Sequence, residues 1–438
     1  MSLAALESEL ARQLVLIGHG GADWTRPRAH PDGHVHDVII VGGGQSGLAA
    51  AFGLLRERVS NILVIDENPA GLEGPWDTYA RMITLRTPKE LNPIDFGIPA
   101  LAYRAWWEAQ HGAAGWEAVD KIARGDWMAY LRWYRRILNL PVRNDTKLSL
   151  IEPMGDGVHR LHLAGQPPLL ARKVVLATGI QGGGEWHTPA MIRDALPRDR
   201  YAHTSEPIDF AALAGKRIGI LGGGASAFDN ANAALSLGVG EAHVFIRRAV
   251  LPRINPIRFM ERVGFTGRYP ALSDADKYAV MASFLDHNQP PTNDTFDRAA
   301  AWPGFDLHLG APWLSVDLID DQVRVTTPQG THDFDFVILS TGLVSDPGLR
   351  SELGAVAPHI ARWADRFTPP PGSANALIDA HPYLGEGFEL TPRTEAGAAA
   401  LHGLFAFNYS ALISLGLSAS ALSGLQTALP RLLPGITD

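Results

Sequence analysis

The pattern of apolar and polar positions is most regular near the start of the chain, where a strand, a turn and a helix follow one another. Residues 36–41 carry a run of β-branched apolar side chains, which predicts a strand buried on both faces. A glycine-rich turn at 42–47 follows, and the apolar pattern of 48–56 predicts a helix. A second apolar run at 61–65 ends in Asp66. These segments together predict a β-α-β unit with parallel strands.

The same pattern returns later in the chain, which makes it an internal repeat. Residues 216–221 predict the strand, 225–237 the helix and 241–248 the second strand. The turn carries Gly222 and Gly224, and an alanine takes the third small-residue position. We therefore expect an α/β chain with two Rossmann-like units.

The turn of the first repeat reads Gly-x-Gly-x-x-Gly, a spacing typical of a dinucleotide site. Gly42 permits the tight turn, Gly44 lets the backbone approach a pyrophosphate, and Gly47 lets the helix pack close to the strand. The first helical residues, Gln45 and Ser46, point backbone N–H groups and the positive end of the helix dipole at the phosphates. In the second repeat the residues expected to face phosphates are Gly222, Gly224, Ala225 and Ser226.

The two repeats differ in the residue that follows the second strand. Asp66, with Glu67 beside it, stands where a carboxylate accepts hydrogen bonds from an adenosine ribose. Superposing the repeats places Arg247 at the position of Asp66, and Arg248 follows. A guanidinium binds the 2′-phosphate that a carboxylate would repel, so we expect the second nucleotide to be NADP(H). An exposed arginine pair at a strand end is the alternative.

Two further apolar strands end in a threonine–glycine pair. Thr178-Gly179 follows one of them and Thr341-Gly342 follows the other. A small residue and a glycine at such a place allow close approach to a bound dinucleotide, or a crossing of the chain between domains.

Composition excludes several other functions. The formal net charge of -8 leaves no basic excess for a nucleic-acid surface. Cysteine is absent, which removes disulfides, thiolate ligands and redox-active cysteine pairs. The apolar stretch 401–425 holds too many polar groups for a membrane span, and no signal-peptide layout is present, so we expect a cytoplasmic protein. The histidines between His19 and His36 lack the spacing of a helical ligand pair, so no metal site is predicted.

The order of these motifs resembles the two-dinucleotide-domain flavoproteins, and most closely the flavin-containing and Baeyer–Villiger monooxygenases. The resemblance covers about 37–426. Glu73-Gly74-Pro75-Trp76 is similar to the Gly-Gly-x-Trp segment of that family, with Glu73 and Pro75 as departures. His203 precedes a Gly-Lys-Arg strand as the signature histidine of the family does, although the rest of the signature is missing.

The resemblance implies that the first unit binds FAD, that the second binds NADP(H), and that the FAD domain is interrupted by the NADP domain. Trp76, Thr178, Gly179, His203, Thr341 and Gly342 then join the expected cofactor-binding residues. The expected segments are an N-terminal helix and connector at 1–35, the first part of the FAD domain at 36–200, the NADP domain with an insertion at 201–331, and the second part of the FAD domain at 332–438.

The same resemblance implies an NADPH- and O₂-dependent monooxygenase that oxygenates a small organic substrate through a C4a-(hydro)peroxyflavin. Arg86 aligns with an asparagine that flavin-containing monooxygenases hold against the flavin, so it is our candidate for stabilising the peroxide. A salt bridge from Arg86 to Glu90 or Asp95 is the alternative. Asn408 is the second catalytic candidate, at the substrate wall.

Two other functions stay open. One is an NADPH oxidase or reductase of the same fold without oxygen insertion, and the other is a redox sensor that keeps FAD as a structural element. Disulfide reductases of this architecture need a cysteine pair, which the chain lacks. The helix expected at 2–16 could serve as an arm in a homodimer. No membrane or nucleic-acid partner is expected.

Overall fold

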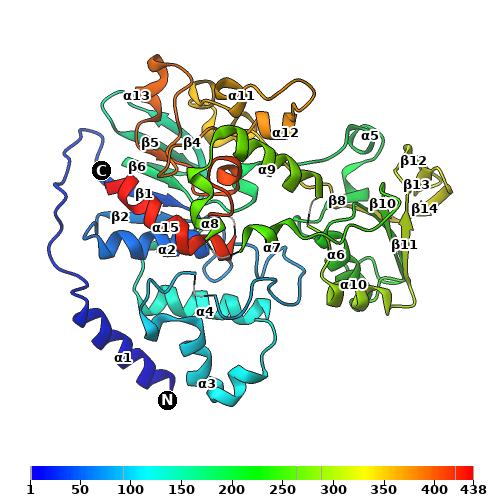
Figure 1. Cartoon of the computed structure of the whole chain (residues 1–438), viewed down its shortest axis with the longest axis horizontal. Coiled ribbons are helices and arrows are strands. Elements are labelled where there is room, and N and C mark those ends of the chain that lie inside the picture. Colours follow the sequence, from blue (N-terminus) through cyan, green and yellow to red (C-terminus); the bar gives the residue numbers. More distant parts are fainter. Residues whose placement is uncertain (1, 92, 263, 288, 420, 438) are drawn as a thin grey trace.

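The computed structural model describes residues 2–437 except 92, 263, 288 and 420. Figure 1 shows two lobes, each built around a largely parallel sheet. The larger lobe holds both ends of the chain, and the smaller lobe holds the second repeat.

The sheet of the larger lobe has the strand order β3-β2-β1-β6-β5-β4, and β17 pairs with β6. Its central strand β1 (Val35–Val41) runs parallel to β2 (Ile62–Ile65) and β6 (Gln166–Leu176). Because Val41 lies opposite Ile65, the glycine turn and Asp66 leave the sheet at the same edge. The other strands are β3 (Val142–Arg143), β4 (Leu148–Pro153), β5 (His159–Leu163) and β17 (Leu404–Phe405).

Helices cover this sheet and extend the lobe. Helix α2 (Gln45–Arg56) packs against α15 (Leu422–Thr437), and the two lie next to each other in Figure 1. Helices α3 (Tyr103–Ala118) and α4 (Arg124–Ile137) join an aromatic cluster below them. The predicted N-terminal helix is present as α1 (Leu3–Leu16), and it packs against α3 of the same chain.

The sheet of the smaller lobe is wholly parallel, with the order β11-β10-β9-β15-β8. Its strands are β8 (Tyr201–His203), β9 (Arg217–Leu221), β10 (Glu241–Ile246), β11 (Phe305–Leu309) and β15 (Phe336–Leu339). Helices α6 (Ala225–Ser236) and α10 (Asn293–Ala300) contribute to the core on one face. The other face packs against the antiparallel sheet of β12 (Ser315–Ile319), β13 (Gln322–Thr327) and β14 (Gly330–Phe334).

The placement of β15 moves one expected boundary. This strand was expected in the final segment at 332–438, but it pairs with β8 and β9, so the smaller lobe extends at least to Leu339. An apolar run predicts a buried strand but does not show which parallel sheet receives it.

The expected insertion also packs differently from its place in the sequence. Helices α7 (Pro256–Met260), α8 (Phe265–Arg268) and α9 (Asp274–His287) follow the second repeat, yet they pack on α14 (Leu412–Leu415) and α15 of the larger lobe. The remaining short elements are α5 (Ala190–Arg193), α11 (Trp363–Arg366), α12 (Ala376–Asp379), α13 (Ala398–Leu401), β7 (Gly184–Trp186) and β16 (Leu343–Ser345). Among the described residues, no helix is long and apolar enough to cross a bilayer.

Candidate active site

The glycine turn after β1 has the shape that its spacing predicts. Gly42 has a φ of 108°, and a Cβ there would lie 2.4 Å from the carbonyl oxygen of Ala177. A Cβ on Gly47 would lie 1.8 Å from the carbonyl oxygen of Gly42, so only glycine lets α2 approach β1 this closely. At Gly44 the nearest atom would be Gly74 Cα at 3.7 Å, which leaves room above the helix N-terminus for a phosphate.

The two acids after β2 have different surroundings. Asp66 is buried, and its carboxylate accepts hydrogen bonds from Gly43 N at 2.7 Å and from both Asn68 N and Asn68 Nδ2, at 2.8 Å and 3.0 Å. A carboxylate has about four acceptor positions, so capacity for a ribose hydroxyl remains. Burial raises the pKa of Asp66. Glu67 instead pairs with Lys147 at the surface, 2.9 Å away. The geometry thus favours Asp66 as the ribose ligand.

A cavity of about 300 Å³ adjoins this turn. One residue of its lining is a departure from the Gly-Gly-x-Trp segment, and its contacts show what that residue does. Glu73 lines the cavity and is buried. Its carboxylate forms an ion pair with Arg135 and accepts hydrogen bonds from Gly71 N at 2.9 Å and Asn144 Nδ2 at 2.7 Å. The glutamate therefore holds the loop that borders Gly43, beside the turn where the adenosine end of a dinucleotide is expected.

Two contacts attach the start of α2 to neighbouring elements, and a third attaches Trp76 to α4. The Gln45 side chain accepts a hydrogen bond from Trp127 Nε1 on α4 at 3.2 Å. The Ser46 hydroxyl donates to the carbonyl oxygen of Ala419 at 2.9 Å. The carbonyl of Trp76 accepts from Arg124, also on α4. Residues expected at the cofactor thus lie beside the glycine turn, and α4 connects two of them.

Asn408 forms a hydrogen bond to the first threonine–glycine pair. It is 2% exposed, and its Nδ2 donates to the Thr178 hydroxyl at 3.1 Å. Its Oδ1 accepts from the backbone N–H and the hydroxyl of Ser410, at 2.9 Å and 2.6 Å. The carbonyl of Gly179 accepts from Tyr409 N at 3.1 Å. These bonds make Asn408 a positioning residue for Thr178 and Gly179, and only one of its N–H groups has no partner among the described residues.

The second glycine turn has a similar backbone. Gly222 has a φ of 130°, and a Cβ there would lie 2.2 Å from the carbonyl oxygen of Ser340. Helix α6 begins after Gly224, its N-cap. Unlike the first helix, its initial N–H is used within the chain, because Ala225 N donates to the carbonyl of Gln289 at 2.9 Å. Ser226 is exposed in the next position.

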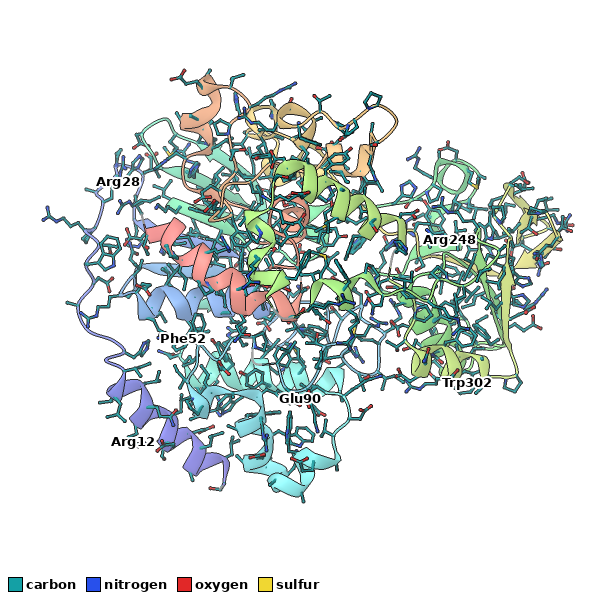
Figure 2. All side chains as sticks on the ribbon, in the orientation of Figure 1. Arg12, Arg28, Phe52, Glu90, Arg248 and Trp302 are labelled. Carbon is teal, nitrogen blue, oxygen red and sulfur yellow. The ribbon has the colours of Figure 1, made fainter. Side chains whose placement is uncertain are left out.

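The two arginines after β10 have different environments. Arg248, labelled in Figure 2, forms an ion pair with Asp286 at 3.5 Å. Arg247 is exposed and has no ion-pair or hydrogen-bond partner in the part of the chain that the structure describes. Among the described residues, Arg247 thus stays the candidate for contact with a 2′-phosphate.

Arg86 joins the two lobes. Its guanidinium forms an ion pair with Asp229 on α6, a residue 143 positions away. The pair replaces the expected alternatives, since no ion pair to Glu90 or Asp95 forms and Asp95 instead accepts from Gly97 N at 2.8 Å. Burial raises the pKa of Asp229, whereas the Arg86 cation acts to lower it. Arg86 therefore lies at the joint between the nucleotide units.

His203 and the second threonine–glycine pair lie at the connection between the lobes. His203 is buried on β8 and stacks on Trp186, with ring centroids 4.8 Å apart. Burial lowers the pKa of His203 to about 4, so its ring is neutral at pH 7. The Thr341 hydroxyl donates to the carbonyl of His187, and His187 N donates to the carbonyl of Gly342 at 2.9 Å. These residues hold the crossing of the chain between lobes.

A cavity of about 370 Å³ lies beside this joint. Helix α10 of the smaller lobe contributes Asp294 and Arg298, and Lys121 of the larger lobe pairs with Asp294 at 2.7 Å. The other side chains that matter for the argument are Tyr103, Trp107 and Asp126. Trp107 lines the cavity, whereas Trp106 and Trp127 are buried in the core. The charged residues were not predicted from the sequence, because no local pattern joins segments from different lobes.

A protein family and a curated protein are similar to this chain in sequence. A family model described as FAD-NAD(P)-binding matches residues 39–181. The chain is 66% identical to the "FAD-dependent urate hydroxylase" of Xanthomonas campestris pv. campestris, over 100% of this chain and 93% of that protein.

Solved structures share the fold at much lower identity. The ornithine N-hydroxylase of Kutzneria sp. 744 has a TM-score of 0.70 at 18% identity, covering 92% of this chain and 99% of its own. The L-lysine 6-monooxygenase of Pseudomonas syringae gives the same values. The flavin-containing monooxygenase of Stenotrophomonas maltophilia has a TM-score of 0.56 at 19% identity, covering 92% of this chain and 98% of its own. The predicted architecture of two dinucleotide-binding units is confirmed.

Proposed function

The chain belongs to the family of FAD-dependent NAD(P)H monooxygenases that includes the Xanthomonas urate hydroxylase, and we propose that its own substrate is urate. The observation that carries the proposal is the 66% identity spread over the whole chain. The fold alone does not select a substrate, because structures with the same fold include enzymes named for ornithine and for lysine.

FAD, when bound, supplies the two-electron chemistry with the nicotinamide and with O₂. The overall reaction balances as urate, O₂, NADPH and a proton giving hydroxylated urate, NADP⁺ and water. One oxygen atom enters the substrate, the other leaves as water, and NADPH provides two electrons. The protein has to hold the two nucleotides and the substrate in register and keep water out.

The cavity of about 370 Å³ between the lobes suits a flat, polar substrate. Trp107 offers an aromatic face to a purine ring, and Tyr103 is stacked behind it. Lys121 and Arg298 can donate to its carbonyl oxygens, while Asp126 and Asp294 can accept from its N–H groups. The cavity thus supplies stacking surfaces with both hydrogen-bond polarities, as the edge of urate requires.

Neighbouring contacts link this cavity to both nucleotide units. Trp127 packs on Tyr103, with ring centroids 5.6 Å apart, and donates to Gln45 at the first glycine turn. Arg298 is near enough to Asp229 for its charge to lower the pKa of that carboxyl. A substrate in the cavity would therefore lie between the first turn and the Arg86–Asp229 pair.

The test is the stoichiometry of the purified, FAD-loaded enzyme. Urate, NADPH and O₂ are followed together, and we expect them to disappear in equal amounts without hydrogen peroxide. NADPH oxidation that yields peroxide and leaves urate intact would indicate the oxidase alternative. Flavin that NADPH fails to reduce would indicate the sensor.

A matched pair of variants tests the placement of urate. Arg298→Met should raise the KM for urate roughly 10-fold while leaving flavin reduction by NADPH intact, because a hydrogen bond to a charged group is lost. Arg26→Met removes an exposed arginine of the N-terminal connector and should change neither quantity. An unchanged KM in Arg298→Met would place urate elsewhere, without contradicting urate hydroxylation itself.

A further inference from the structure

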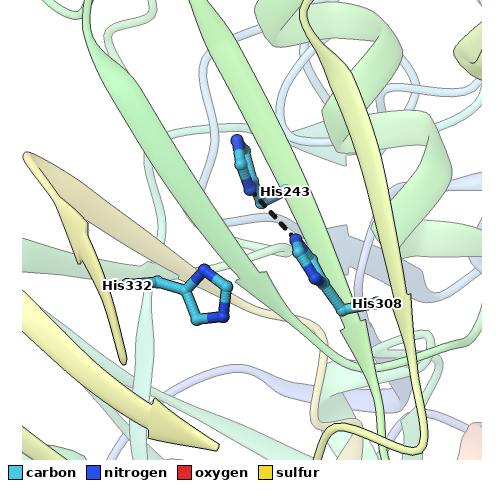
Figure 3. Close-up of side chains that lie close together, drawn as sticks. All are labelled: His243, His308 and His332. Atoms are coloured by element: carbon cyan, nitrogen blue, oxygen red, sulfur yellow. Dashed lines mark hydrogen bonds between the residues drawn. The ribbon is translucent and has the colours of Figure 1, made fainter. Parts of the chain in front are cut away.

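Three histidines from different strands meet in the smaller lobe. His243 lies on β10, His308 on β11 and His332 on β14, and Figure 3 shows their rings gathered between the strands. One ring nitrogen from each lies within 4.8 Å of the other two. The separation of His243 Nδ1 and His308 Nε2 is 3.1 Å.

These separations are close to those around a bound metal ion. Zinc–nitrogen bonds of about 2.0–2.1 Å in a tetrahedron set neighbouring ligand atoms roughly 3.3 Å apart. The His243–His308 distance is already close to this value, and His332 needs a shift of about 1.5 Å toward the pair. Asp306 Oδ2 lies 3.3 Å from His308 Nε2 and 3.8 Å from His243 Nδ1, which places a carboxylate at the fourth position.

The protonation pattern of the cluster also suits a metal. His243 Nε2 lies 3.0 Å from Glu241 Oε2, which favours the tautomer with the proton on Nε2 and the lone pair on Nδ1. A carboxylate behind a ligating imidazole is the usual partner in histidine metal sites. Glu241 is itself held by Arg217 at 2.7 Å.

His332 supplies a second observation in favour of a metal ion, independent of the distances between the ring nitrogens. Its Nε2 is buried and has no hydrogen-bond partner among the described residues. A buried ring nitrogen without a partner costs free energy that a bound ion would recover.

We propose that His243, His308 and His332, with Asp306 as the fourth ligand, bind one divalent transition-metal ion, and that Zn²⁺ fits the set. Imidazole ligands suit zinc, copper and nickel, and a carboxylate completes a tetrahedral zinc site.

The ion has a structural role, because its ligands come from both sheets of the lobe. Val244 on β10 points into the core under α6, whereas Phe245 faces the antiparallel sheet beside the histidines. The metal would therefore pin β14 to β10 and β11, on the face of the parallel sheet opposite α6. This proposal does not depend on the substrate.

The experiment uses untagged, FAD-loaded enzyme that has been stripped with chelator. Titration with Zn²⁺ should give one ion per chain by calorimetry and by elemental analysis. Co²⁺ should give tetrahedral absorption bands at wavelengths beyond those of the flavin, and Zn²⁺ should displace it. Zn²⁺ should also raise the melting temperature.

Variants decide whether these residues are the ligands. His332→Gln and His308→Gln should lose the stoichiometric ion and the cobalt bands, and Glu241→Gln should weaken zinc binding about 10- to 100-fold. His162→Gln is the matched control, since that ring pairs with Glu152 in the other lobe. Wild-type enzyme that binds no stoichiometric ion, or His332→Gln that binds as tightly as wild type, would overturn the proposal. Flavin content of each variant shows whether it has folded.

Discussion

The two glycine turns share a backbone but differ in what surrounds them. Gly42 and Gly222 both have positive φ, and at each a Cβ would collide with a carbonyl of the adjacent central strand or its extension. After the second strand, however, the first unit has a buried, hydrogen-bonded acid, and the second has an exposed Arg247 without an ion-pair partner among the described residues. We therefore propose that the turn fixes where a pyrophosphate lies and that the residue after the second strand selects the nucleotide.

The surroundings also differ in burial. The first turn belongs to the large core that includes α2, α4 and α15, and Ser46 of that turn is buried. The second turn lies over the smaller core of α6 and α10, and Ser226 at the equivalent position is exposed. We infer that the first unit retains its nucleotide through turnover and the second exchanges it, as a flavin enzyme with a diffusible reductant requires.

Adding a side chain at either glycine turn should have the largest effect, and the two turns should differ in which nucleotide is lost. Gly47→Val should cost more than about 3 kcal/mol, since the blocking atom is a backbone oxygen 1.8 Å from the new Cβ, and soluble protein with FAD should be lost. Gly222→Val should retain FAD but lose NADPH binding. Flavin content and NADPH titration measure both effects. Gly125→Ala, where a Cβ meets nothing within 4 Å, should resemble wild type.

Breaking the pair between the lobes should have the next largest effect. Arg86→Gln leaves the buried Asp229 carboxyl without its cation, which should cost about 3 kcal/mol at neutral pH. Burial has already raised the pKa of Asp229, so its contribution to stability is present at low pH and is lost as pH rises through the folded-state pKa. Without Arg86 that pKa rises further.

The cost of Arg86→Gln should therefore shrink between about pH 8 and about pH 5, as urea unfolding of variant and wild type would show. A cost that does not change with pH would mean that Asp229 is not the partner that matters. If Arg86 also contacts the reacting atoms, as its alignment suggests, the variant should release more peroxide per NADPH at equal flavin reduction. Unchanged peroxide release would mean that Arg86 acts only through its ion pair with Asp229 at the joint between the lobes.

The choice of coenzyme should respond to a single charge. Arg247→Asp should lower kcat/KM for NADPH roughly 10- to 100-fold relative to NADH, because a charge-assisted contact to the 2′-phosphate is replaced by repulsion. Arg26→Asp makes the same change of charge at another exposed arginine and should leave the ratio unaltered. If Arg247→Asp keeps the wild-type ratio, the superposition of the two repeats is wrong.

The smallest expected effect compares equivalent serines. Ser46→Ala removes a buried hydroxyl that donates to Ala419, and it should cost about 1 kcal/mol of stability. Ser226→Ala removes an exposed hydroxyl and should stay within about 0.5 kcal/mol of wild type. The midpoints of denaturant unfolding, compared at equal m-values, would measure both changes in stability. Equal costs would contradict the difference in burial on which the comparison rests.

The parts of the fold that were predicted best from the sequence are those formed by residues close together in the chain. The glycine spacing and apolar runs predicted both β-α-β units, because turn, helix and strand are each specified within a few residues. The family resemblance then predicted a flavin monooxygenase, which the relatives confirm. The boundary near residue 331 was misplaced, because one buried parallel strand looks like another.

Contacts between side chains that are distant along the chain could not be predicted from the sequence. Nothing near Arg86 points to Asp229, and the histidine cluster joins three strands that are distant along the chain. Asn408 was identified as a candidate, but its bonds to Thr178 and Ser410 became visible only with the fold. Histidine spacing along single elements predicted no metal site, and ligands on neighbouring strands, as we propose here, would leave no such spacing.

The most direct test of the account is the reduction of bound flavin by NADPH without oxygen, measured by rapid mixing in wild type and in Gly222→Val with full FAD occupancy. The account predicts that one equivalent of NADPH bleaches the wild-type flavin, while the flavin of Gly222→Val stays oxidised at the same NADPH concentration. Bleaching of both proteins at the same rate would contradict the claim that the second glycine turn delivers the reductant.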